Sequence, residues 1–247
     1  MVWHKIKNVK MLIKNYEYEI TLVIDFIKEK FKGQDKLFEY IKSMGDIVVF
    51  GGVPRDLIFF KRNEIRDIDL VITDINNQII EAIIGNKKNR KTRFGGLKCT
   101  INKTPFDIWA LNDTWSFNHR KFKYKVRFEN LPKSVFLSID ALIVNINTKQ
   151  LIDYNFKKNF EKKIIDIIFE PNPFPALCVL RSFKYSKKYN FKLSDKLQAY
   201  IHSYLNNTYN VIEELSKMYI SHYGNLSSPI CYMFPEIKKY LSNALIK

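Results

Sequence analysis

The chain has 247 residues, 46% of them hydrophobic and 27% charged, which is enough for one large domain or two small ones with a real core. Eight glycines and eight prolines are too few for a fibrous or linker-rich protein, and the apolar content excludes wholesale disorder. The net charge of +16 points to a polyanionic partner, either nucleic acid or an anionic membrane surface. The alternative is that an AT-rich genome inflates the lysine content.

Targeting and membrane segments are not expected in this chain. Lysine interrupts the apolar stretches of residues 1–14, and the longest apolar runs fall far below the ~20 residues that span a bilayer. Cys99, Cys178 and Cys231 are scattered, as reduced core residues are, and the histidines share no zinc-ligand spacing with them. We therefore expect a cytoplasmic protein without a membrane partner.

Helices are expected first. Apolar residues recur at helical spacing from Ile20 to Phe31, and a second helix over residues 35–44 ends at Gly45. The next part of the chain mixes β-branched runs with turns, and it contains expected helices over residues 54–60 and 76–84 and a hairpin turn at 147–149. The expected strands cover residues 46–50, 66–72, 96–101, 105–111, 122–128, 136–146 and 150–154.

From about residue 156 the chain is predicted to be helical. The expected helices cover residues 176–189, 195–205, 209–221 and 235–245. The whole pattern predicts an α+β fold: a mixed sheet with flanking helices, followed by a small α-helical C-terminal domain.

The stretch VVFGGVPRDLIFFKRNEIRDIDLVI, residues 48–72, carries the strongest chemical signal. Gly51 and Gly52 follow a buried strand and let the backbone approach a ligand closely. A helix starts directly after them, so its free N–H groups face the same place. This arrangement is typical of a phosphate site.

Asp67 and Asp69 stand two residues apart on an expected strand, so alternation places both carboxylates on one face of the sheet. Carboxylates this close repel each other unless a cation neutralises them, and Mg²⁺ is the usual one, with Mn²⁺ as the alternative. Asp107, in the run PFDIWAL, is the candidate third carboxylate. These residues predict a site for two metal ions of the kind used in phosphoryl transfer.

The pattern resembles the nucleotidyltransferases of the DNA polymerase β superfamily, and more narrowly the class II branch of CCA-adding enzymes and bacterial poly(A) polymerases. That branch carries G-G-x-V-R-D and then D-x-D-L-V, where this sequence has GGVPRD over residues 51–56 and DIDLV over residues 67–71. A weaker likeness runs over residues 46–193 and includes PALCVLRSFKYSKKYNF, which is similar to the family's neck helix.

The resemblance implies a polymerase β-type catalytic head over residues 46–155, with N-terminal helices 1–45 packed on it and a helical neck and C-terminal domain over 156–247. It also implies template-independent transfer of AMP or CMP from an NTP to the 3′ end of an RNA, with release of pyrophosphate. The nucleotide-binding residues that it implies are Gly51, Gly52, Arg55, Asp56, Arg181 and Lys184. For Arg55 and Asp56 the alternative is an ion pair that organises the loop.

Three basic segments are candidate contacts for RNA phosphates and bases. Residues 86–103 contain no acidic residue, residues 120–127 alternate cations with Phe122, Tyr124 and Val126, and a third set of cations shares a face of the expected helix 176–189. An ordinary solvated surface is the alternative for each segment. The candidate RNA-binding residues are Lys91, Arg93, Arg120, Lys123, Lys125 and Lys188.

Three classes of function stay open, because the sequence departs from the family. Val135 and Phe136 stand where the family has Arg and Asp, and the chain beyond the neck helix is short for gripping a tRNA. The first class is an RNA 3′-end nucleotidyltransferase, with a protein partner that supplies the missing grip on RNA. The second is a toxin or defence nucleotidyltransferase that modifies tRNA or protein. The third is an inactive RNA-binding subunit of a larger complex.

Overall fold

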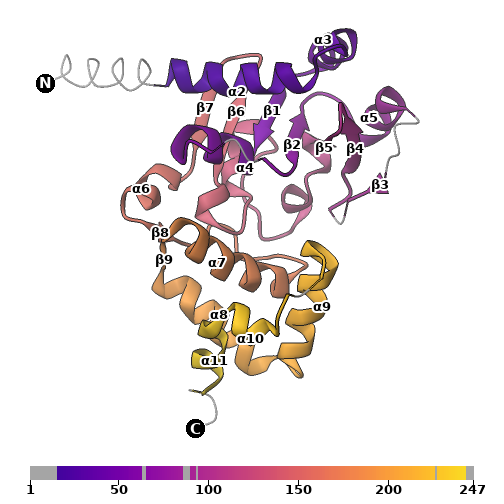
Figure 1. The fold of residues 1–247 in the computed structure, drawn as a ribbon. Coiled ribbons are helices and arrows are strands. Elements are labelled where there is room, and N and C mark those ends of the chain that lie inside the picture. The colour runs from indigo at the N-terminus through magenta and orange to yellow at the C-terminus, as the bar shows by residue number, and fades with distance from the viewer. Residues whose placement is uncertain (1–15, 63–64, 86–89, 93, 226, 243–247) are drawn as a thin grey trace, which may run out of the picture. The chain divides into compact units, whose positions relative to one another are not determined.

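The computed structural model describes residues 16–242 except residues 63–64, 86–89, 93 and 226 (Figure 1). The chain forms two compact units. The first runs up to Val135 and includes Asp140–Tyr154, and the second consists of Phe136–Ile139 and the chain from Asn155 onward. The main chain therefore passes from one unit to the other after Val135, after Ile139 and after Tyr154.

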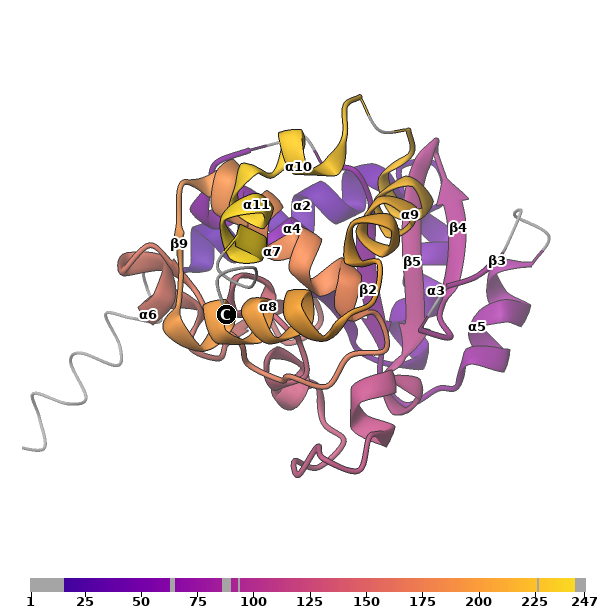
Figure 2. The ribbon, with the colours of Figure 1, turned by 90° about the horizontal axis from the view of Figure 1, so that it is seen from below.

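A seven-stranded mixed sheet forms the centre of the first unit, in the order β3-β4-β5-β2-β1-β6-β7. Strands β2 and β5 are parallel, and the other neighbouring pairs are antiparallel. Figure 2 shows β4 and β5 side by side. The strands are β1 (Ile47–Phe50), β2 (Ile68–Ile72), β3 (Arg90–Lys91), β4 (Leu97–Ile101), β5 (Thr104–Ala110), β6 (Leu142–Asn145) and β7 (Gln150–Asp153).

Helices pack on one face of this sheet. The three longer ones are α2 (Glu17–Lys30), α3 (Asp35–Met44) and α5 (Asn77–Ile84). Their apolar residues share one core with every second strand residue, including Val23 of α2, Leu70 of β2 and Ile108 of β5. The Asn76 side chain caps α5 by accepting a hydrogen bond from the Ile79 N–H (3.0 Å). The predicted helices over residues 35–44 and 76–84 and the predicted α+β fold are confirmed.

A smaller apolar cluster lies on the other face of the sheet. Val48, Val71 and Ile143 come from three adjacent strands, and they pack with Leu111 and Leu131 from the loops between strands. Directly after β1 the chain forms the short helix α4 (Gly52–Pro54), which continues into a π-helical turn over Arg55–Phe59. The helix predicted over residues 54–60 is thus present, with a wider turn than an α-helix.

Two predicted strands differ from the structure. Residues 122–128 form no strand, because residues 123–127 are all exposed and no alternate face is buried against the core. The predicted strand over residues 136–146 is shorter and contributes only β6, since Ser138–Asp140 form a 3₁₀ turn and Phe136–Ile139 belong to the second unit. The 147–149 turn does join β6 to β7, as predicted.

The second unit is mainly helical. A two-stranded parallel ladder joins β8 (Ile164–Ile165) to β9 (Lys192–Leu193). Its helices are α6 (Phe156–Glu161), α7 (Pro175–Tyr189), α8 (Asp195–Asn207), α9 (Val211–Tyr223), α10 (Ile230–Met233) and α11 (Pro235–Ser242). The four helices predicted after residue 175 correspond to α7, α8, α9 and α11. Within the described ranges, no helix combines the length and the apolar character that a membrane crossing requires.

Candidate active site

Two aspartates occupy directly paired positions on neighbouring parallel strands. Asp69 of β2 is the register partner of Asp107 of β5. The adjacent strand residues Ile68 and Leu70 are buried in the helix-covered core, so alternation turns the aspartates to the opposite face. Asp67 comes immediately before β2, two residues before Asp69. The sheet therefore places Asp69 and Asp107 side by side on one face, while Asp67 precedes β2 in the chain.

The turn after β1 passes close to the Asp69 carboxylate. Gly51 has φ +66° and ψ −112°, a backbone conformation that residues with a side chain rarely adopt. A Cβ placed on Gly51 would lie 3.6 Å from Asp69 Oδ2, so the backbone itself borders the carboxylate. The Gly51 N–H donates to the Leu142 carbonyl (3.3 Å), which holds the turn to β6. Gly52, the other predicted glycine, begins α4 directly after this turn.

Arg55 forms a buried ion network with two aspartates. Its Nε and Nη2 donate to Asp56 Oδ1 (2.9 Å) and Oδ2 (3.0 Å), and its Nη1 donates to Asp140 Oδ1 (2.5 Å). The three residues are only 4%, 5% and 7% exposed. This network ties the π-helical turn to the residue that leads into β6. A nucleotide-binding role for Arg55 and Asp56 stays a prediction, and the geometry adds a structural role in shaping the loop after Gly52.

Two of the three carboxylates each face a cation. Arg66 Nη2 lies 2.7 Å from Asp67 Oδ2, and the Arg66 side chain is 62% exposed. Lys98 Nζ lies 3.0 Å from Asp107 Oδ1 and 3.4 Å from Oδ2. The buried Oδ1 of Asp107 has no properly directed hydrogen bond from any described residue. Asp67 and Asp107 thus each meet a protein cation, and Asp107 keeps one oxygen without a directed hydrogen bond.

Comparison with solved structures identifies the fold. A CCA-adding enzyme in complex with ATP is 17% identical and matches with a TM-score of 0.58 over 87% of this chain and 50% of its own. A tRNA nucleotidyltransferase with a primer tRNA and an ATP analogue is 18% identical, with a TM-score of 0.54 over 85% of this chain and 60% of its own. The Thermotoga maritima CCA-adding enzyme with tRNA is also 18% identical, with a TM-score of 0.54 over 83% and 52%.

The chain shares the fold of tRNA nucleotidyltransferases. The expected mixed sheet with flanking helices is confirmed, and it matches the fold of those structures. The chain spans 50% to 60% of the length of these matched structures. No protein-family model matches the chain, and no curated protein matches it.

A nucleotidyltransferase fold implies a divalent metal, and the aspartates offer the right ligand chemistry for one. Carboxylate oxygens are the ligands that Mg²⁺ and Mn²⁺ prefer, and Asp107 Oδ1 is a buried oxygen without a directed donor. Across the described ranges, however, no three Asp, Glu, His or Cys side chains converge closely enough to form a ready-made metal cluster. Asp67 is turned to Arg66 and Asp107 to Lys98, so metal binding at this site requires side-chain rearrangement.

The predicted RNA-binding residues of the first unit lie in two segments. Lys91 is exposed on the edge strand β3, and Arg93 lies outside the described residues. Arg120, Lys123 and Lys125 are exposed in the irregular segment over residues 120–127, and they form no ion pair with any other described residue. The cationic strand expected there is wrong as to conformation, but the cations do reach solvent.

An aromatic pair with a lysine lies next to this basic segment. Lys133 Nζ lies 4.2 Å from the ring centroid of Tyr124 and 5.5 Å from that of Tyr154. A hydrogen bond with Tyr124 raises the pKa of the Tyr154 hydroxyl. Tyr124 is 46% exposed, so its ring is accessible beside the lysines of residues 120–127.

The remaining predicted residues belong to the second unit. Arg181, Lys184 and Lys188 lie on α7, and each has its cationic group near a tyrosine ring. The shortest of these contacts joins Lys184 Nζ to the ring centroid of Tyr223 on α9, at 3.6 Å. Arg181 Nη2 also donates to the Tyr185 hydroxyl (2.9 Å). The predicted combination of basic and aromatic residues is present on α7, while their nucleotide-binding and RNA-binding roles stay predictions.

Sequence reasoning missed two residues of the site, Asp140 and Lys98. Asp140 contacts Arg55 across 85 residues of sequence, where the chain returns to β6, and no local pattern indicated that contact. Lys98 contacts Asp107 only through the β4–β5 register, in which the two are direct partners. Nothing in the local sequence indicated that pairing.

Proposed function

We propose that this chain is an RNA nucleotidyltransferase that transfers AMP or CMP from an NTP to the 3′ end of an RNA. The observation that carries the proposal is the direct pairing of Asp69 with Asp107 beside the Gly51 turn. That pairing occurs in a fold shared with tRNA nucleotidyltransferases, some of them solved with ATP or CTP. The residue pattern and the fold thus point to the same chemistry.

In the proposed reaction the 3′ oxygen of the acceptor attacks the α-phosphorus of the NTP. The bond to the bridging oxygen of the β-phosphate breaks, pyrophosphate leaves, and the acceptor hydroxyl loses its proton to solvent. Asp67 and Asp69 would hold divalent metal, with Asp107 as the third carboxylate. Bound metal would neutralise charge on the phosphates and favour ionisation of the attacking hydroxyl.

The protein's own groups have distinct tasks in this reaction. The backbone at Gly51 leaves space for a triphosphate next to Asp69, because no side chain occupies that position. The Arg55 network fixes the loop that follows. Positioning of this kind supplies much of the rate enhancement in phosphoryl transfer.

The acceptor is proposed to be RNA on the basis of charge. The chain carries a net charge of +16, and the exposed cations of residues 120–127 lie beside the accessible Tyr124 ring. Lysines and arginines neutralise backbone phosphates, while an aromatic ring stacks on a base of any sequence. A partner chain that contributes further RNA grip is part of the proposal.

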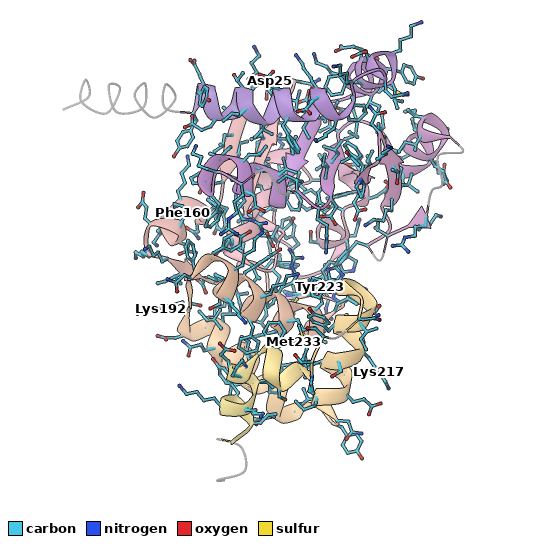
Figure 3. The ribbon with its side chains drawn as sticks, viewed as in Figure 1. Asp25, Phe160, Lys192, Lys217, Tyr223 and Met233 are labelled. Carbon is cyan, nitrogen blue, oxygen red and sulfur yellow. The ribbon has the colours of Figure 1, made fainter. Side chains whose placement is uncertain are left out.

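The test is a transfer assay with matched carboxylate variants. Purified protein, Mg²⁺ and each labelled NTP in turn are incubated with total RNA and cell protein. The wild type is compared with Asp69→Asn and with Asp25→Asn, a control at an exposed position on the outer side of α2 (Figure 3). We expect label in RNA from ATP or CTP with the wild type and the control, and none with Asp69→Asn.

Other outcomes would move the proposal to another class. Label in protein would indicate a nucleotidyltransferase of the toxin or defence type. RNA binding without transfer by any variant, in the presence of every NTP, would contradict the catalytic proposal and leave an RNA-binding subunit. Label that persists in Asp69→Asn would show that the chemistry occurs elsewhere.

A further inference from the structure

Lys98 is fixed opposite the third carboxylate by the sheet itself. In the antiparallel β4–β5 pair Lys98 and Asp107 are direct register partners, so their side chains emerge on the same face. The Nζ–Oδ1 distance is 3.0 Å, and the side chains are 31% and 22% exposed. The pairing is therefore a cross-strand contact with little freedom to separate.

The lysine provides the positive charge at this end of the site. Among described residues, Lys98 is the group that forms an ion pair with Asp107. Asp107 Oδ1 is buried with Lys98 in place, so moving Lys98 away would remove the cation that lies 3.0 Å from this oxygen. A divalent ion at Asp107 would have to take the place of this ammonium group.

The ion pair of Asp67 differs from that of Asp107 in its cation. The partner of Asp67, Arg66, is its neighbour in sequence and is 62% exposed, against 31% for Lys98. Asp67 itself is 23% exposed, close to the 22% of Asp107, so the difference lies in the cation: the exposed Arg66 side chain can move into solvent when another cation binds Asp67. A metal ion therefore displaces an exposed arginine at Asp67, whereas at Asp107 it has to displace the less exposed Lys98.

We propose that Lys98 acts as a built-in cation that takes the place of one of the two metal ions. The site then binds one divalent ion tightly at Asp67 and Asp69, and binds a second only by displacing Lys98 from Asp107. The inference rests on the proposed nucleotidyltransferase function, which supplies the reason for metal at this site. It makes Lys98 a positioning residue for Asp107 that also sets the metal stoichiometry.

The test counts metal ions without using activity. Mn²⁺ binding to the full chain is measured by electron paramagnetic resonance of free Mn²⁺, for wild type, Lys98→Met and Lys36→Met. Lys36 is an exposed lysine on α3, in the helical layer on the other face of the sheet. We expect one tight ion per chain in wild type and in Lys36→Met, and two in Lys98→Met. The second ion should bind at least about tenfold more tightly in Lys98→Met, because a charge-assisted hydrogen bond no longer competes with it.

Thermal unfolding in EDTA provides the fold control and a second readout. Lys98→Met should unfold at a lower temperature than wild type without metal, and Mn²⁺ should raise its unfolding temperature more than that of wild type. Two tight ions in wild type, or a single ion in Lys98→Met that is folded by circular dichroism, would overturn the inference while leaving the proposed function intact. No tight ion in any variant would contradict the proposed function, and the inference with it.

Discussion

Replacing Arg55 by methionine would remove a guanidinium that satisfies two buried carboxylates at once. Three hydrogen bonds of 2.5–3.0 Å join it to Asp56 and Asp140, and all three residues are at most 7% exposed. Removing one partner of a buried ion pair costs about 3–5 kcal/mol, because the other charge stays buried and uncompensated. For a unit of this size each kcal/mol lowers the unfolding temperature by about 2–4 °C, so Arg55→Met should lose about 6–20 °C.

The assay is thermal and urea unfolding of Arg55→Met, Asp140→Asn and the double variant, together with the KM for NTP. Arg55→Met removes the guanidinium from two carboxylates, whereas the double variant removes it from only one, so the loss of stability in the double variant should be smaller than the sum of the two single losses by about 0.5–3 kcal/mol. Loss of NTP affinity in a variant that keeps its stability within about 1 kcal/mol would refute the structural reasoning. Arg55 would then act chiefly on the nucleotide.

Three further predictions concern the backbone, the RNA and a buried thiol. Gly51→Ala and Gly85→Ala should each lose about 1–3 kcal/mol in urea unfolding, because both glycines have positive φ outside the left-handed helical region, but only Gly51→Ala should also lower nucleotidyl transfer. Lys123→Ala with Lys125→Ala should reduce the slope of log affinity against log salt for single-stranded RNA by about 1.4, measured by fluorescence anisotropy; an unchanged slope would remove this segment from the RNA interface. Burial raises the pKa of the Cys178 thiol to about 12, while the unfolded thiol ionises near pH ~9. Its contribution to stability is thus complete below pH ~9 and falls by about 1.4 kcal/mol per pH unit toward pH 12, so Cys178→Ala should lose less stability than wild type between pH 8 and pH 10.

The sequence predicted those helices and strands that are marked by local features, namely the spacing of apolar residues and the turn residues at their ends. The helix over residues 35–44 has apolar residues at helical spacing and a glycine at its end, and it forms with those bounds. Strands β1, β2, β4 and β5 are short β-branched runs between turns, and each was predicted to within a few residues. The glycine turn and the aspartate pair were visible for the same reason, because their spacing is local.

Features that depend on distant residues were missed. The alternation of cations and aromatics over residues 122–128 predicts a strand, yet a strand also needs a neighbour with which to pair, and that part of the first unit offers none. The contact of Lys98 with Asp107 depends on the register of β4 against β5. The contact of Arg55 with Asp140 depends on where the chain re-enters the first unit before β6. Neither can be obtained from spacing along the sequence.

The passage of the chain out of the first unit and back has a consequence for dissecting the protein. Phe136–Ile139 belong to the second unit, where Leu137 pairs with Ile167 and Ser138 Oγ accepts from the Asp166 N–H (2.9 Å), before Asp140 returns to Arg55. A fragment that stops at Tyr154 would therefore expose the buried apolar residues Phe136, Leu137 and Ile139 without their partners in the second unit. A fragment that starts at Asn155 would lack Phe136–Ile139, which belong to the second unit and pair with Ile167. During synthesis on the ribosome, Leu137 emerges about thirty residues before Ile167. The segment Phe136–Ile139 therefore cannot form its native pairing until that later part of the chain has been translated.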